Sequence, residues 1–289
     1  MKVRKALIPA AGLGTRFLSA TKVVPKELLP IVDRPAMEYI VEELANSGIE
    51  EVTFILSTEK EMIFDHFQSG SFLEQMLHQR GQIHRMKHLH DLMERVTFKK
   101  VYQPEPKGLG HAVLCGRAHI GSEPFVVVLP DDLVRSKTPC VKQLISVFEK
   151  EHHSVVAVEE VPKENVKFYG IVGGKKTKGK KYFQVDQIVE KPSILKAPSR
   201  MAVIGRYLLD PMIFEILETT RPGAGGEIQL TDALSVLSRL HQLIALPFEG
   251  RRVDTGQPHG WLEANLLFAL DRKEIRDQIR PVIKTLARI

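Results

Sequence analysis

Ala6-Leu-Ile-Pro-Ala-Ala-Gly-Leu-Gly-Thr-Arg-Phe-Leu18, followed by Pro25-Lys-Glu-Leu-Leu-Pro30, is the part of the sequence that decides the fold. An apolar strand enters a glycine-rich turn, where backbone N–H groups can close on a polyanion and a positive φ carries little cost. Arg16 and Lys26 add two positive charges at the mouth of that turn. The combination predicts a binding site for a triphosphate at the end of the first strand.

Two common phosphate-binding motifs do not fit this turn. A Walker loop requires G-x-x-x-x-G-K-[ST], which follows neither glycine. The dinucleotide fingerprint G-x-G-x-x-G fails because Phe17 stands where a third glycine belongs after Gly12 and Gly14. An NAD-binding oxidoreductase is therefore disfavoured.

The first half of the chain alternates between strands and helical periodicity. Apolar, β-rich runs predict buried strands over 2–9, 51–57, 96–103 and 125–130. A helix is predicted between Pro35 and Gly48, where apolar residues recur at helical spacing, namely Met37, Ile40, Val41 and Leu44. Such alternation favours right-handed crossovers and a parallel, Rossmann-like sheet, with a nucleotide at the carboxyl ends of its strands.

The pattern changes in the second half. Shorter, antiparallel strands are expected over 154–161, 169–173, 182–189 and 202–208, followed by helices over 211–218 and 228–240 and a strand near 245–248. A last helix is expected over 260–280, with Leu262, Leu266, Ala269 and Leu270 on one face.

No long linker separates the two halves. We therefore predict an α/β fold with a Rossmann-like, mixed but mostly parallel central sheet flanked by helices. A single domain is expected over 1–289, with an antiparallel portion over about 154–210 and a C-terminal helix over about 260–280.

Composition limits the class of protein. Of 289 residues, 43% are hydrophobic and 26% charged, as in ordinary globular proteins. No run of apolar residues reaches membrane-spanning length and a strand begins near the first residue, so we expect neither a membrane span nor a signal peptide. Cys115 and Cys140 lack metal-binding spacing and fit a reducing cytoplasm.

The formal net charge of +6 does not by itself indicate nucleic acid. Its densest lysine run, over 175–181, lies between two glycines and a predicted strand, which favours a solvated hairpin tip. No nucleic-acid-binding motif accompanies it, so no nucleic-acid partner is expected. A basic cleft for phosphates accounts for part of the excess.

The string G-x-G-T-R followed by P-K resembles the signature of the nucleoside-triphosphate:sugar-phosphate nucleotidylyltransferases. The opening Ala-Ala-Gly and the spelling Pro-Lys-Glu-Leu-Leu-Pro are most similar to the bacterial members that act on UTP and glucose 1-phosphate. The likeness runs from Lys5 to about Ala269, with every motif in family order, and is weakest over 65–95. It implies transfer of uridylyl from UTP to α-D-glucose 1-phosphate, giving UDP-glucose and pyrophosphate, with a Mg²⁺ cofactor and a homo-oligomer (dimer or tetramer).

Gln103-Pro-Glu-Pro-Lys-Gly-Leu-Gly-His-Ala-Val113 ends a predicted strand and begins a helix. From the residues alone, a simple connection and a ligand-binding loop both remain open, although an amide can donate to and accept from a pyrimidine edge. The resemblance to the family segment Q-x-x-x-x-G-L-G-H-A implies that Gln103 and the Gly108 backbone contact the base. It places the rest of the nucleotide site at Ala10, Ala11, Gly12, Gly14, Thr15 and Asp131.

Leu129-Pro-Asp-Asp-Leu133 places two carboxylates at the end of a buried strand. A Mg²⁺ ion bound to phosphates needs only one or two protein carboxylates. The resemblance implies that Asp131 and Asp254 are the metal ligands, whereas Asp132 is left open between a helix cap and the metal. Thr255 stands where related enzymes often carry cysteine, and we expect little functional loss from that difference.

Ile188-Val-Glu-Lys-Pro192 ends another predicted strand. Glu190 and Lys191 would point apart unless the strand ends there, which Pro192 favours. The resemblance implies that Glu190 binds sugar hydroxyls and that Lys191 binds the sugar phosphate. Gly170 and Val203 are implied as the other walls, which makes 154–210 the sugar-binding portion.

The same resemblance assigns the catalytic residues. Arg16 is implied on the β- and γ-phosphates, Lys26 beside the α-phosphate and Lys191 on the incoming phosphate. Three alternatives stay open: a dTTP-specific or other-sugar-specific enzyme, and a catalytically silent paralogue acting as a regulatory binding subunit. A metal site at the histidines of 84–90 is disfavoured, because a third or fourth ligand in a fixed frame is not evident.

Overall fold

The computed structural model describes residues 2–176, 178–223 and 226–288. Its main sheet is built from β1 (Lys5–Pro9), β4 (Glu51–Leu56), β5 (Thr97–Tyr102), β6 (Phe125–Val128), β8 (Ser154–Glu160), β9 (Gly170–Lys176), β10 (Phe183–Glu190), β11 (Met201–Leu209) and β12 (Leu243–Pro247). These strands lie in the order β5-β4-β1-β6-β11-β8-β12-β10-β9. Two short ribbons pair β13 (Arg251–Asp254) with β7 (Asp132–Arg135), and β2 (Pro30–Ile31) with β3 (Arg34–Pro35).

The direction of the strands confirms the predicted mixed, mostly parallel sheet. Strand β1 pairs in parallel with both β4 and β6, β4 with β5, and β8 with β12. Strand β11 is antiparallel to β6 and β8, and β10 is antiparallel to β12 and β9. Among the described strands of this sheet, β10 and β11 alone therefore run against the rest.

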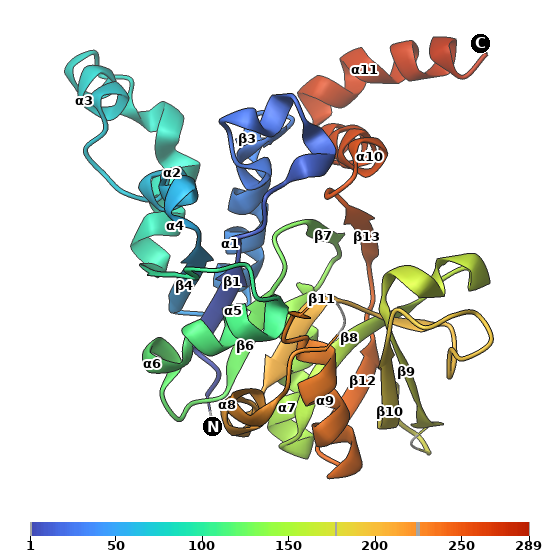
Figure 1. Ribbon diagram of the computed structural model, residues 1–289. Helices are drawn as coiled ribbons and strands as arrows, with labels where there is room; N and C mark the ends of the chain where they lie inside the picture. The colour runs from blue at the N-terminus through green and yellow to red at the C-terminus, as the bar shows by residue number, and fades with distance from the viewer. Residues whose placement is uncertain (1, 177, 224–225, 289) are drawn as a thin grey trace.

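Helices cover both faces of the sheet (Figure 1). The α-helices of the described residues are α1 (Ala36–Asn46), α2 (Glu61–Asp65), α3 (Phe72–Gln79), α4 (Lys87–Arg95), α5 (Leu109–Cys115), α6 (Arg117–Ile120), α7 (Cys140–Glu151), α8 (Met212–Thr219), α9 (Leu230–Arg239), α10 (Pro258–Ala269) and α11 (Lys273–Leu286). Side chains alternate along each strand, so Ala6 and Ile8 join a core with α1 and α7, whereas Leu7 joins a core with α5, α8 and α9. This two-sided burial explains why the first strands are continuous apolar runs.

The second half corrects one expectation about strand length. Strands β8, β9, β10 and β11 do pair in antiparallel fashion, as predicted for 154–210. They are not shorter, however, because β11 has nine residues and β1 has five. Strand β11 is long because it pairs with β6, β8 and β9 along its length.

The single helix expected over 260–280 is wrong, because the chain forms α10 and α11 with a corner between them. Arg272 is extended, with φ −93° and ψ 116°. Its guanidinium pairs with Asp33 at 2.5 Å, and the neighbouring Asp271 accepts a 2.7 Å hydrogen bond from Arg135. These ion pairs fasten the corner to the body of the protein, and α11 then extends away from it (Figure 1).

The lysine run forms the predicted hairpin tip between β9 and β10. Thr177 lies outside the described residues, while Lys180 and Lys181 pair with Glu151 and Glu249. In the described part of the chain, no helix is both long enough and apolar enough to cross a membrane.

Candidate functional site

The carboxyl ends of four parallel strands meet at one edge of the sheet. Strand β1 leads to Ala11 and Gly12, β5 to Gln103 and β6 to Asp131. The Gln103 N–H donates to the Leu56 carbonyl at 2.8 Å, so the end of β5 is held in register with β4. Two cavities, of about 310 and 350 Å³, open at this edge.

The first cavity collects the residues predicted to bind the nucleotide. Its lining includes Ala11, Gly12, Lys26, Gln103, Gly108 and Asp131. Gly108 has φ +94°, and a Cβ there would lie 2.8 Å from the Ile228 carbonyl oxygen, so this position requires glycine. The loop is fastened to the opposite wall, because Ile228 N–H donates to Lys107 and the Ile228 carbonyl accepts from Gly110, each at 2.8 Å.

The orientation of the Gln103 amide is fixed by its neighbours. Its Nε2 donates to the Gly108 carbonyl at 3.1 Å and to His111 Nδ1 at 3.0 Å. A carbonyl oxygen can only accept, and burial lowers the pKa of His111, which keeps that ring neutral and able to accept. The amide oxygen Oε1 therefore faces away from both and presents an acceptor.

The second cavity contains the residues predicted for the sugar, its phosphate and the metal, together with Arg16, the residue predicted on the β- and γ-phosphates of the nucleotide. Its lining includes Arg16, Asp131, Gly170, Glu190, Lys191, Val203 and Asp254. Both cavities are also lined by Leu109, Leu129, Asp131 and Glu227, so they are adjoining halves of one cleft. Asp131 stands at their junction.

Three residues predicted for the nucleotide site, Ala10, Gly14 and Thr15, are not among the residues that line either cavity. Ala10 is 2% exposed and packs in the core, while its N–H donates to Ile55 at 2.8 Å. Gly14 has φ +67° and forms the turn ahead of Thr15, which begins a short 3-10 segment with Arg16. These residues shape the turn that carries Arg16 into the cleft.

Two carboxylates converge at the junction. A Cβ built on Gly256 would lie 3.0 Å from both Asp131 Oδ2 and Asp254 Oδ1. Strand β13 delivers Asp254, because it pairs with β7 so that Asp254 lies opposite Asp132. Thr255, which follows Asp254, connects the end of β13 to Asp131, because its N–H and its hydroxyl donate to the Asp131 carbonyl at 2.7 and 3.0 Å. A hydroxyl is a stronger donor than the thiol of a cysteine would be here.

Asp132 also lines the second cavity, but it is neither a helix cap nor hydrogen-bonded to Asp131. Its Oδ1 accepts from Arg252 Nε at 2.5 Å, and its Oδ2 accepts from the Gly205 N–H at 3.2 Å. Arg252 also donates to Glu159 at 2.7 Å. This buried pair fixes β7 and β13 against β11, which is a structural task.

Lys26 lies against Asp131, with 2.6 Å between Nζ and Oδ2. Burial disfavours the charged form of both groups. Lys26 nevertheless lowers the pKa of Asp131, and Asp131 together with Glu27 raises the pKa of Lys26. Both groups are therefore charged at neutral pH. They offer a cation and an anion at the same point of the cleft.

The second cavity has a fixed carboxylate and a more exposed cation. Strand β10 ends at Glu190, and Lys191 follows with φ +43°, so both side chains line the second cavity, as the strand-end argument required. Thr231 donates to Glu190 Oε2 at 2.7 Å, a contact that the sequence did not indicate. Lys191 Nζ is 3.4 Å from Glu190 Oε1.

Sequence reasoning also missed Arg206, which is fully buried beneath Asp131. Its guanidinium donates to the carbonyls of Leu129, Gly205 and Asp132, at 3.3, 3.1 and 2.6 Å. Its remaining N–H groups bond the Glu43 carboxylate, at distances down to 2.8 Å. Arg206 thereby holds the 129–132 turn in place. An arginine in an otherwise apolar strand was the available indication.

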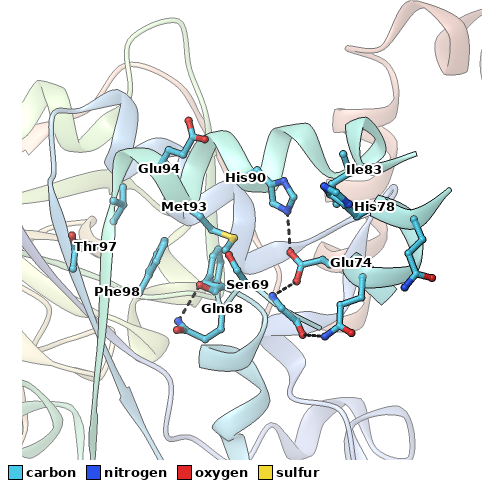
Figure 2. Close-up of a pocket in the computed structure, with 15 residues that line it drawn as sticks. Gln68, Ser69, Glu74, His78, Ile83, His90, Met93, Glu94, Thr97 and Phe98 are labelled. Atoms are coloured by element: carbon cyan, nitrogen blue, oxygen red, sulfur yellow. Dashed lines mark hydrogen bonds and ion pairs between the residues drawn. The ribbon is translucent and has the colours of Figure 1, made fainter. Parts of the chain in front are cut away.

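Two of the histidines of 84–90, His88 and His90, each lie beside one acidic side chain. His90 pairs with Glu74 at 2.9 Å, on the wall of a cavity of about 1080 Å³ between α3, α4 and the start of β5 (Figure 2). No group of three or more His, Cys, Asp or Glu side chains placed to hold a metal ion occurs among the described residues. Metal binding at Asp131 and Asp254 would thus need further ligands from a bound phosphate.

Known proteins match this chain along almost its whole length. A model of the nucleotidyl transferase family matches residues 5–269. A protein of Bacillus subtilis named UTP–glucose-1-phosphate uridylyltransferase is 46% identical over 285 residues, which cover 99% of this chain and 97% of that protein. A Staphylococcus epidermidis protein of the same name is 44% identical over 292 residues, covering 99% of each.

Solved structures are similar over almost the whole chain. The crystal structure of an apo UDP-glucose pyrophosphorylase has a TM-score of 0.88 at 41% identity, covering 94% of this chain and 100% of that one. A UTP-bound UDP-glucose pyrophosphorylase from Acinetobacter baumannii has a TM-score of 0.89 at 36% identity, covering 98% and 99%.

The buried Arg206–Glu43 pair yields a prediction about stability. Glu43→Gln should lower the free energy of unfolding by about 3 kcal/mol or more, because the Arg206 charge stays buried without a counter-charge. Glu42→Gln, on the same helix, removes a one-third exposed carboxylate and should cost under about 1 kcal/mol. Urea unfolding measures both, and equal losses would contradict the role given to Arg206.

Proposed function

The chain belongs to the nucleotidyl transferase family, and we propose that it transfers the uridylyl group of UTP to α-D-glucose 1-phosphate, giving UDP-glucose and pyrophosphate. The observation that carries this proposal is the pair of adjoining cavities that share Asp131. One cavity presents a glycine turn and an amide acceptor, and the other presents Lys191 and Glu190. The sugar-binding portion of the single domain would be 154–210.

Catalysis in this cleft is a matter of positioning and charge. A sugar-phosphate oxygen attacks the α-phosphorus of UTP in line with the departing pyrophosphate, and the nucleophile is already an anion, so no general base is required. The barrier arises from bringing two polyanions together and from charge growing on the leaving group. Arg16 would hold the β- and γ-phosphates, Lys26 the α-phosphate and Lys191 the incoming phosphate.

Nucleotidyl transferases of this kind generally use a divalent metal, and we propose Mg²⁺ held by Asp131 and Asp254. The residues fit, because two carboxylate oxygens converge on one point and Mg²⁺ typically takes one or two carboxylates plus phosphate oxygens. When bound, the ion would supply charge neutralisation between the two substrates. The protein's part is to hold both carboxylates still, through Thr255 and the β7–β13 ribbon.

A homo-oligomer is a further part of the proposal. Leu262 and Leu266 on α10 are 55% and 38% exposed, and Val282 and Leu286 on α11 are also exposed. Helix α11 has no buried residue of its own. We propose that these two helices form a contact between copies of the chain, a dimer or a tetramer.

Removing a phosphate-binding charge should abolish most turnover. Arg16→Ala or Lys26→Ala should lower kcat by about 10²-fold or more, the scale expected when a preorganised charge is lost from a phosphoryl site. Pyrophosphate release from UTP and glucose 1-phosphate measures it, with circular dichroism as the control for folding. Release by the unaltered protein excludes the silent paralogue, and near-normal turnover in folded variants would refute these roles.

The metal proposal predicts a shifted cation requirement. Asp254→Asn should raise the Mg²⁺ concentration needed for half-maximal rate, because a lone carboxylate holds the ion more weakly. Asp271→Asn, an acid remote from the cleft that pairs with Arg135, serves as the control and should leave the requirement unchanged. Titration of the rate with Mg²⁺ decides, and an unchanged requirement in both Asp254→Asn and Asp131→Asn would remove these acids as ligands.

The orientation of Gln103 predicts base selection. Uracil N3–H can donate to Gln103 Oε1, whereas cytosine N3 is an acceptor and would face it without a hydrogen. Such a mismatch costs roughly 1–3 kcal/mol when buried, so kcat/KM should be about tenfold to a hundredfold lower for CTP than for UTP.

Discrimination against dTTP should be weaker, because thymine keeps the same edge. Measuring kcat/KM for UTP, CTP and dTTP with glucose 1-phosphate, and then with other sugar phosphates, separates the alternatives. Equal values for UTP and CTP would refute the role of Gln103. A value for dTTP above that for UTP would favour the thymidylyl alternative.

A further inference from the structure

Directly beside Lys26 lies a buried ion pair that the reaction as described does not use. Lys60 Nζ is 3.0 and 2.9 Å from the two carboxylate oxygens of Glu27, so the ammonium occupies both of them. Glu27 is 2% exposed and Lys60 7% exposed. The two residues are 33 positions apart in the sequence and come from different elements.

Stability alone does not explain this pair. Taking an ammonium and a carboxylate out of water costs several kcal/mol per ion, and replacing such a pair by neutral side chains is often without net loss. Burial lowers the pKa of Lys60 even though the contact with Glu27 acts to raise that pKa, so the surroundings of Lys60 disfavour a charged ammonium. A buried pair of this kind is better explained by what it holds in position.

What it holds is the segment that carries Lys26. Glu27 is the next residue along a turn of three residues, Lys26–Leu28, which follows Pro25. Lys60 ends the 3-10 segment Thr58–Lys60, which follows β4 after the single residue Ser57, and its N–H donates to the Ser57 carbonyl at 3.1 Å. The pair thus connects the Lys26 turn to the frame of the sheet.

The charges also explain why Glu27 needs a partner of its own. Lys26, Glu27 and Asp131 line the same cavity, and although burial acts to lower the pKa of Lys26, the negative charges of Asp131 and Glu27 raise it, so both carboxylates attract one ammonium. Asp131 is 2.6 Å from that ammonium, whereas both oxygens of Glu27, which is 2% exposed at the cavity wall, face Lys60. Without Lys60, an unpaired buried Glu27 would compete for Lys26 and draw it away from Asp131.

We propose that Lys60 is a positioning residue for nucleotidyl transfer: by occupying both oxygens of Glu27, it leaves the Lys26 ammonium free to face Asp131 and the α-phosphate. The inference rests on the role proposed for Lys26. Lys60 itself touches neither substrate in this account. Its action passes through Glu27 alone.

Three variants test the inference by pyrophosphate release. Lys60→Met should lower kcat on the order of 10- to 100-fold, because a displacement of about 1 Å at a phosphate ligand is enough for such a loss. Lys60→Met combined with Glu27→Gln should recover most of that loss, because no anion then competes for Lys26. Lys60→Arg, which keeps the charge, should retain more activity than Lys60→Met.

The control is an acid–base pair of the same length in a different part of the protein. Glu74 and His90 are also 2.9 Å apart, but they lie on the wall of the cavity between α3 and α4 (Figure 2). Glu74→Gln should therefore leave kcat unchanged. Circular dichroism and thermal unfolding are recorded for every variant, so that kcat is compared between folded proteins.

A double-mutant cycle that combines Lys60→Met with Lys26→Ala separates this inference from the role of Lys26 itself. In a Lys26→Ala background, Lys60→Met should have little further effect, since the residue it positions is gone. An equal further loss there, normal kcat in folded Lys60→Met, or no recovery in the folded double variant would each overturn the inference. Normal kcat in Lys26→Ala would instead overturn the role of Lys26. If Lys60→Met does not fold, Lys60→Arg and the double variant still decide.

Discussion

One buried guanidinium fixes the centre of the site. Arg206 reaches from β11 to the turn after β6 and donates to the carbonyls of Leu129 and Asp132, on either side of Asp131, and to that of Gly205 on its own strand, while Glu43 on α1 balances its charge. A guanidinium has five N–H donors in a rigid planar fork, and here each of them has an acceptor. A lysine could not span these partners. The position of Asp131 is thus set by a strand, a helix and a turn acting together.

The second acid reaches the same point by a different route. The β7–β13 ribbon begins at the turn that Arg206 holds, and it places Asp254 opposite Asp132. Gly260 completes the approach, because a Cβ there would lie 1.9 Å from the Asp254 carbonyl oxygen. Arg252 then ties the ribbon to Asp132 and Glu159. Each charged group around the junction therefore has either a buried partner or a place in the cleft.

Local patterns in the sequence were sufficient for the strands, the glycine turn and the residues that line the cleft. The family resemblance is confirmed, and Lys26, Gln103, Asp131, Lys191 and Asp254 do line one continuous cleft. These successes share a cause, since strand ends and turns are marked by neighbouring residues. Which lining residues touch substrate stays a prediction.

The sequence predictions failed where the structure depends on contacts between residues that are far apart in the sequence. The break between α10 and α11 depends on Arg135 and Asp33, which are far away in the sequence, so helical periodicity alone missed it. Asp132 could be assigned only once Arg252 was seen beside it. Arg206 and Thr231 act through contacts that no local motif records.

The fastening of the Gln103 loop has a consequence for how the two halves of the cleft respond to each other. Ile228 exchanges hydrogen bonds with Lys107 and Gly110, and three residues later Thr231 bonds Glu190 in the second cavity. If the loop loses freedom around a bound base, the segment that supports Glu190 is restrained with it. Binding in the first cavity would then lower the entropy cost of binding in the second, a coupling that needs no change of shape.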